Sequence, residues 1–73
     1  MNYYEVDLAK VERKRRIDGT AWCIKAKRKP SRADICNLLR KRMREEGMNK
    51  VMYIERLSEK DAKTYFDKAI IIS

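Results

Sequence analysis

The strongest local folding signal in this sequence is the dipeptide Asp18-Gly19, because it indicates where a β-hairpin can turn. Both residue types tolerate a positive φ, which a two-residue type I′ turn requires, and strand-forming sequence lies on either side. Folding about this turn would place apolar residues and arginine stems on a common face that packs on a core. The predicted partners are Ile17 with Thr20, Arg15 with Trp22, Arg13 with Ile24 and Val11 with Ala26.

The opposite face of this predicted hairpin is strongly basic. Like charges across a β-ladder repel one another, so an external anion is one explanation for such a face. The other explanation is a solvated edge whose lysines prevent aggregation. The face would hold six bases, one acid and a cysteine: Lys10, Glu12, Lys14, Arg16, Cys23, Lys25, Lys27 and Lys29.

The first strand has an inconsistent apolar phase. Its apolar residues are even-numbered at Tyr4, Val6 and Leu8 and then odd-numbered at Ala9 and Val11. Since a slip of one residue turns every side chain to the other face, this predicts a β-bulge near Leu8 or Ala9. A longer loop that does not use Asp-Gly is the alternative.

A main helix is expected after the hairpin. Pro30 ends the second strand, Ser31 is an N-cap residue with Asp34 three residues later, and a helix over residues 32–46 ends before Gly47. The helical period places Ile35, Cys36, Leu38, Leu39 and Met43 toward the sheet and Arg40, Lys41 and Arg44 away from it. Arg42 falls in the apolar arc, where its stem is expected to lie along the edge.

The remaining sequence completes a small α+β domain. Residues 50–57 predict a strand buried on both faces. Ser58 predicts the start of a short helix with Ala62, Tyr65 and Phe66 as its apolar stripe, and residues 69–72 predict a strand or a continuation of that helix. The predicted order is β-β-α-β-α-β in one domain over residues 1–73, a hairpin and a main helix packed on a three- or four-stranded sheet.

The basic charge is concentrated in residues 10–44, which hold fourteen Lys and Arg but three acids, a net charge of +11 against +8 for the whole chain. Such a distribution is typical of a protein with a polyanionic partner, most often DNA or RNA. We expect binding of the phosphate backbone by Lys14, Arg15 and Arg16, by Lys25, Lys27, Arg28 and Lys29, and by Arg40, Lys41 and Arg44.

The sequence contains no histidine, which removes Cys/His zinc sites, His general bases and Ser-His-Asp chemistry together. We therefore expect a non-enzymatic protein without a metal or another cofactor. Trp22 is the candidate for stacking on a base, but a core position is the favoured interpretation. Cys23 is expected beside lysines that favour its thiolate, and Cys36 is expected to be a small core residue.

A protein-interaction module is the alternative function. Small size, high charge and the lack of catalytic residues also fit accessory regulators or inhibitors of phages and mobile elements, which bind an acidic or nucleic-acid-processing protein. Exposed strand edges at residues 3–8 or 69–72 would allow a homodimer. Because no apolar run is long enough for a membrane span and the N-terminus lacks a signal-peptide pattern, we expect a cytoplasmic protein without a membrane partner.

Overall fold

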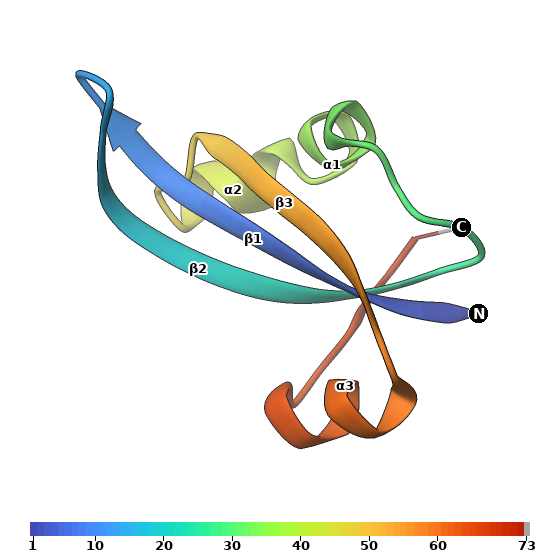
Figure 1. Ribbon diagram of the computed structural model, residues 1–73. Coiled ribbons are helices and arrows are strands. Elements are labelled where there is room, and N and C mark those ends of the chain that lie inside the picture. The colour runs from blue at the N-terminus through green and yellow to red at the C-terminus, as the bar shows by residue number, and fades with distance from the viewer. Residues whose placement is uncertain (73) are drawn as a thin grey trace.

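The computed structural model describes residues 1–72 as a four-stranded mixed sheet with three helices, which confirms the α+β class (Figure 1). The strands are β1 (Asn2–Glu12), β2 (Arg15–Ala26), β3 (Lys50–Leu57) and β4 (Ile70–Ile71). Their order across the sheet is β3-β1-β2-β4. β1 is antiparallel to both β2 and β3, whereas β4 is parallel to β2.

The helices cover the two faces of the sheet unequally. α1 (Arg32–Leu38) and α2 (Arg40–Glu45) lie over one face and together form what we call the helix layer (Figure 1). α3 (Glu59–Tyr65) lies on the other face, where Ala62 packs near Tyr3 and Cys23. The rest of that second face, which we call the open face, has no helix over it in the described residues.

The core lies between the sheet and the helix layer. Val6 and Leu8 of β1, Ile24 of β2 and Ile35 of α1 are fully buried there. Each such side chain stabilises the fold by roughly 1.5–3 kcal/mol relative to an exposed one. The even-numbered residues 4–8 of β1 and 22–26 of β2 face this core, and Trp22 belongs to it with 5% exposure. The prediction that Trp22 is a core residue is therefore confirmed.

The predicted hairpin turn at Asp18-Gly19 is wrong. The turn is Arg13-Lys14, where φ is +49° and +65°, and Glu12 pairs with Arg15. Asp18 and Gly19 instead lie within β2. The hairpin therefore avoids Asp-Gly, as the alternative interpretation allowed, but its loop has two residues rather than more.

The burial of β1 explains this choice of turn. An Asp-Gly hairpin would place Leu8 opposite Lys29 and Asp7 opposite Pro30, so that Val6 would lie beyond the end of the partner strand. In the observed register Val6 pairs with Trp22 and Leu8 with Thr20. Burial of these apolar side chains outweighs the roughly 1–2 kcal/mol that each left-handed non-glycine residue costs in the turn.

The observed register also overturns the predicted basic face. The pairing of β1 with β2 shifts between Lys10 and Val11, which leaves Ile17 as the extra residue of a bulge in β2. A second shift, between β1 and β3, lies at Asp7 and Leu8, close to the predicted site. Because Ile17 interrupts the alternation, the bases at either end of β2 do not form one continuous face.

The predicted helix over residues 32–46 is interrupted at Leu39, which has φ −120° and ψ 23°. Ile35 and Met43 are buried as expected, and Cys36 and Leu39 pack against the core. Leu38 is 61% exposed, contrary to the prediction. The break changes the direction of the helix after α1, so a single helical period no longer describes both segments.

The helix caps are confirmed. Ser31 and Asp34 form a capping box in which Ser31 Oγ accepts from the Asp34 backbone N–H at 3.0 Å, and the Ser31 N–H donates to Asp34 Oδ2 at 2.9 Å. Gly47, with φ +76°, follows α2. The Met48 N–H then donates to the Met43 carbonyl at 2.8 Å, which closes a Schellman motif.

β3 has the predicted bounds but is buried on one face rather than two. Val51 and Ile54 are buried, whereas Tyr53 and Glu55 are exposed on the open face. β3 is an edge strand, and residues 3–8 belong to the central strand β1, so the predicted free edge there is wrong. In and after α3, Ala62 is buried and Phe66 half-buried, but Tyr65 is 74% exposed.

Candidate nucleic-acid interface

Residues 10–20 form a protruding two-stranded arm. Every residue from 12 to 19 is exposed, and the ribbon extends beyond the helix layer (Figure 1). Asn49 fixes the root of the arm. Its Oδ1 accepts from the Val11 N–H and its Nδ2 donates to the Val11 carbonyl, both at 2.9 Å, so its side chain pairs with β1 as a neighbouring strand would.

The positive charge of the arm is concentrated at its turn. Arg13 and Lys14 occupy the two turn positions, and neither forms an ion pair within residues 1–72. Farther back along the arm, Lys10 lies 3.6 Å from Glu12. The Arg16 guanidinium packs over Gly19, at a position where a Cβ would clash with it. The structure thus brings Lys14, Arg15 and Arg16 together with Arg13, which the sequence-based site omitted.

The helix layer presents three of the predicted bases to solvent. Met43 faces the sheet, and at 100° per residue Lys41 lies on the opposite side of α2. Arg40 and Arg44 are one turn apart and share a flank. All three are exposed, and none forms an ion pair in the described part of the chain.

Arg42 lies on the other flank, where it takes part in a contact that fixes α2 to the sheet. Its guanidinium carbon is 5.8 Å from the centre of the Trp22 ring, and its Nε is 3.4 Å from Glu46 Oε2. The same carboxylate oxygen accepts a hydrogen bond from Trp22 Nε1 at 2.9 Å. This agrees with the expected position at the edge of the apolar arc and satisfies the one polar group of the buried indole.

The third basic cluster is the junction loop, residues 27–31, between β2 and α1. Lys27, Arg28 and Lys29 are exposed and make no ion pair within residues 1–72. Lys25 does not belong with them. It lies on the α3 side of the sheet, where its Nζ is 5.4 Å from the centre of the Tyr3 ring.

The basic clusters are spread along the length of the molecule. The turn of the arm and the junction loop lie at opposite ends of β2 (Figure 1). The longest dimension of the protein is 36 Å. Because the chain runs back through α1 and α2 between these ends, the helix layer lies along the path that joins the two clusters (Figure 1).

The open face carries a cluster of acids that sequence analysis missed. Glu5 pairs with Glu55 across β1 and β3, and Asp7 pairs with Tyr53. The contact with Asp7, burial and the charges of Asp7 and Glu55 raise the pKa of Glu5 to about 7. The proximity of the Asp7 carboxylate, with smaller effects from burial and the nearby acids, raises the pKa of Tyr53 to about 12. The alternation of Glu5 and Asp7 with apolar residues indicated that both acids share one face of β1. The sequence did not show the register with β3, so the position of Glu55 opposite Glu5 could not be predicted.

Cys23 lies on the α3 side rather than on a cationic face, so the expected activation of its thiolate is wrong. It is 3% exposed and pairs with Glu5. Burial, and secondarily the charge of Glu5, raise the pKa of the Cys23 thiol. Cys36 is half-buried against the core, as expected.

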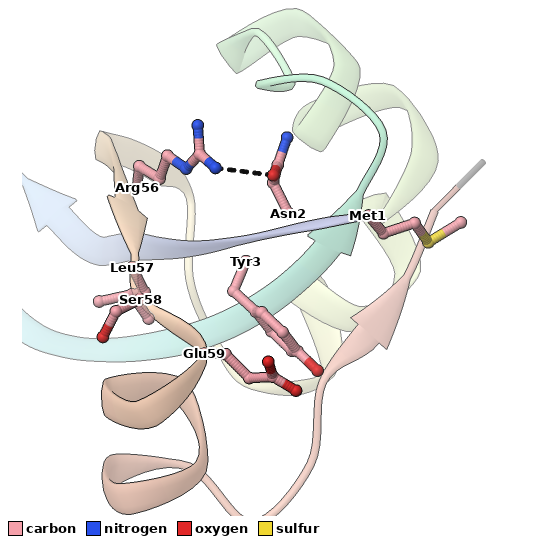
Figure 2. Close-up of a pocket in the computed structure, with 7 residues that line it drawn as sticks. All are labelled: Met1, Asn2, Tyr3, Arg56, Leu57, Ser58 and Glu59. Carbon is pink, nitrogen blue, oxygen red and sulfur yellow. Dashed lines mark hydrogen bonds between the residues drawn. The ribbon is translucent and has the colours of Figure 1, made fainter.

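A hollow of about 520 Å³ lies between the N-terminal end of β1 and the start of α3 (Figure 2). Arg56 donates to Asn2 Oδ1 at 2.8 Å on one side of it, while Tyr3 and Glu59 point to the other side (Figure 2). Glu59 is paired with Lys63 at 2.9 Å. Since these charged groups already have protein partners, this hollow is a weaker candidate for an anion site than the exposed basic clusters.

Comparison with known proteins identifies no relative. No protein-family model matches the chain, and no curated protein and no solved structure matches it. Within residues 1–72, no cluster of acids, histidines and cysteines suits a metal ion, and no helix has the length and apolar character to cross a bilayer. The distribution of charge over this fold is therefore the feature from which a function can be inferred.

Proposed function

We propose that this protein binds nucleic acid without catalysing a reaction on it, through the arm, the helix layer and the junction loop. The observation that carries the proposal is the separation of bases from acids on the surface of this fold. Nine of the ten predicted bases are exposed and free of ion pairs on these three elements in the described chain. The open face carries Glu5, Asp7 and Glu55 instead, so it would repel a polyanion, which favours contact through the three basic elements.

The mechanism is electrostatic contact with phosphates. Guanidinium groups donate two parallel hydrogen bonds to phosphate oxygens, and each neutralised phosphate releases counterions. Contact with both ends of a 36 Å surface requires about ten base pairs of duplex at about 3.4 Å each, or an extended single strand of similar length. The proposed setting is the cytoplasm, where Cys23 and Cys36 remain reduced.

A salt titration with a matched pair of variants tests this proposal. Fluorescence anisotropy would measure affinity for labelled DNA and RNA, single- and double-stranded, between about 50 and 200 mM salt. Neutralising Arg40 and Arg44 with Gln should reduce the slope of log affinity against log salt by about 2. Neutralising Lys60 and Lys68, which lie in and after α3, removes the same charge and should leave the slope nearly unchanged.

Two results would contradict the proposal: absence of binding to every oligonucleotide at low salt, or equal effects of the two variant pairs. The second result would mean that net charge alone attracts the polyanion and that no surface is dedicated to it.

One observation favours a protein-interaction module as the second candidate. β4 pairs with β2 only at Ile24 and Lys25, so the outer edge of β2 from Arg15 to Cys23 is open within residues 1–72. An open edge is a template for an additional strand from a partner protein or a second copy. Pull-down from lysate with and without nuclease distinguishes the candidates, because a protein partner held by this edge would survive nuclease treatment.

A further inference from the structure

A second hollow, of about 280 Å³, lies between the end of β2, the junction loop and α1. Its walls include four apolar residues, Ala26, Pro30, Leu38 and Ile72. Leu38 is 61% exposed here, although the helical period predicted it in the core. An exposed leucine at the wall of a hollow suits a ligand that has an apolar surface.

The rim of this hollow is basic. Lys27, Arg28 and Lys29 line it and have no ion-pair partner within residues 1–72. Asp34 is the acid on the wall, and its carboxylate already accepts from the Ser31 N–H in the capping box. That hydrogen bond, the interaction with the Ser31 side chain and, least of the three, the charge of Arg28 lower the pKa of Asp34. The ligand that complements this rim therefore carries negative charge beside an apolar surface.

The backbone next to the hollow is already hydrogen-bonded. The Ile72 N–H donates to the Lys25 carbonyl at 3.0 Å, and Asn2 Nδ2 donates to the Lys27 carbonyl at 3.3 Å. An extended peptide would need free backbone groups at this edge to add as a strand. These contacts argue against an acidic peptide added as a strand, whereas a ligand with a flat apolar surface and phosphates needs no free backbone group here.

We propose that this hollow holds an unpaired base of single-stranded nucleic acid while Lys27, Arg28 and Lys29 contact the adjacent phosphates. The inference rests on the proposed function and specifies its substrate class. The apolar wall is aliphatic, so the flat face of a base would pack on it by apolar contact, and such packing is tolerant of base identity because every base has such a face. A base within a duplex is stacked and paired and does not reach the wall formed by Leu38, so the site selects single strands.

The test combines base removal with one side-chain substitution. Anisotropy would compare a thymidine oligonucleotide of about twelve nucleotides with an abasic oligonucleotide of the same length and charge. The natural protein should bind the thymidine strand about fivefold or more tightly, the gain expected if the base buries about 40 Å² of apolar surface in the hollow. Leu38→Gln should remove that preference and leave affinity for the abasic strand unchanged.

The matched control is Ile17→Gln, which replaces a comparably exposed apolar residue (53%) on the arm and should leave the base preference intact. Both substitutions are at exposed positions, where changes in stability stay within about 0.5 kcal/mol, and a thermal melt confirms folding.

Three outcomes overturn the inference in different ways. If neither oligonucleotide binds at low salt, the proposed function itself is contradicted. Equal binding of the thymidine and abasic strands, or a preference that survives Leu38→Gln, removes only the base site. Tighter binding of an acidic, leucine-containing peptide than of the thymidine strand, lost in Leu38→Gln, would assign the hollow to a protein partner.

Discussion

Replacing Glu5 with Gln is expected to stabilise the protein at about pH 8 and to have little effect near pH 5. The pKa of Glu5 is raised from 4.5 to about 7 in the folded protein, chiefly by its contact with Asp7. Between these values the folded state binds more protons than the unfolded state, so stability falls as pH rises. Gln imitates the protonated carboxyl group and removes the charge that accounts for this loss.

The magnitude follows from the size of the shift. A change from 4.5 to about 7 corresponds to about 3 kcal/mol at about 1.4 kcal/mol per pH unit. Because the Glu5 side chain is only half-buried, solvent screening reduces the expected effect to about 1 kcal/mol. For a domain of this size, that free energy raises the midpoint of thermal unfolding by about 4–8 °C.

Thermal melts followed by circular dichroism at about pH 5 and pH 8 would measure the difference between the variant and its parent. Glu45→Gln, which removes one exposed carboxylate of α2, controls for the change in net charge. An equal difference in stability between Glu5→Gln and its parent at both pH values would contradict this expectation. In that case Asp7 on the same strand, and Cys23, Tyr53 and Glu55 on the neighbouring strands, would not hold the proton of Glu5.

Three further substitutions test how the elements are fixed to one another. Asn49→Ala removes both hydrogen bonds to Val11, so amide hydrogen exchange at Val11 should accelerate and stability should fall by about 1–3 kcal/mol; unchanged exchange would show that Asn49 does not hold the arm. Glu46→Ala leaves the buried Trp22 indole N–H without its acceptor and should cost about 1–3 kcal/mol, with a changed fluorescence spectrum. Gly47→Ala should destabilise the protein by about 1 kcal/mol in chemical denaturation because φ is +76°, and an equal or higher midpoint would contradict that argument.

The helix starts and the bounds of β3 could be predicted from the sequence because their signals are local. Ser31 and Ser58 each accept from the backbone three residues ahead, as the spacing to Asp34 and Asp61 indicates. The break at Leu39 could not be predicted, since neither Gly nor Pro marks it.

The hairpin shows why a strong local signal can mislead. Asp-Gly is favourable in a turn, but the free energy of a turn residue is smaller than that of several buried apolar side chains. The apolar residues of β1 (Tyr4, Val6 and Leu8) and of β2 (Trp22, Ile24 and Ala26) are all even-numbered. In the true register, even-numbered residues pair with even-numbered residues over this part of the hairpin, so this pattern indicated that register. For the candidate interface, the identity of the bases was visible in the sequence, whereas the separation of Lys25 from the others depended on that register.

The turn at Arg13-Lys14 has a consequence for how this protein can be changed. Both residues have a left-handed backbone conformation, which is strained for Arg and Lys. Asn and Gly adopt this conformation at a lower cost in free energy. Asn-Gly at these positions would therefore make the molecule more stable and would at the same time remove two positive charges from the tip of the arm. At these two positions, a more stable turn and a positively charged tip exclude each other. Selection for stability alone would be expected to have replaced Arg13 and Lys14.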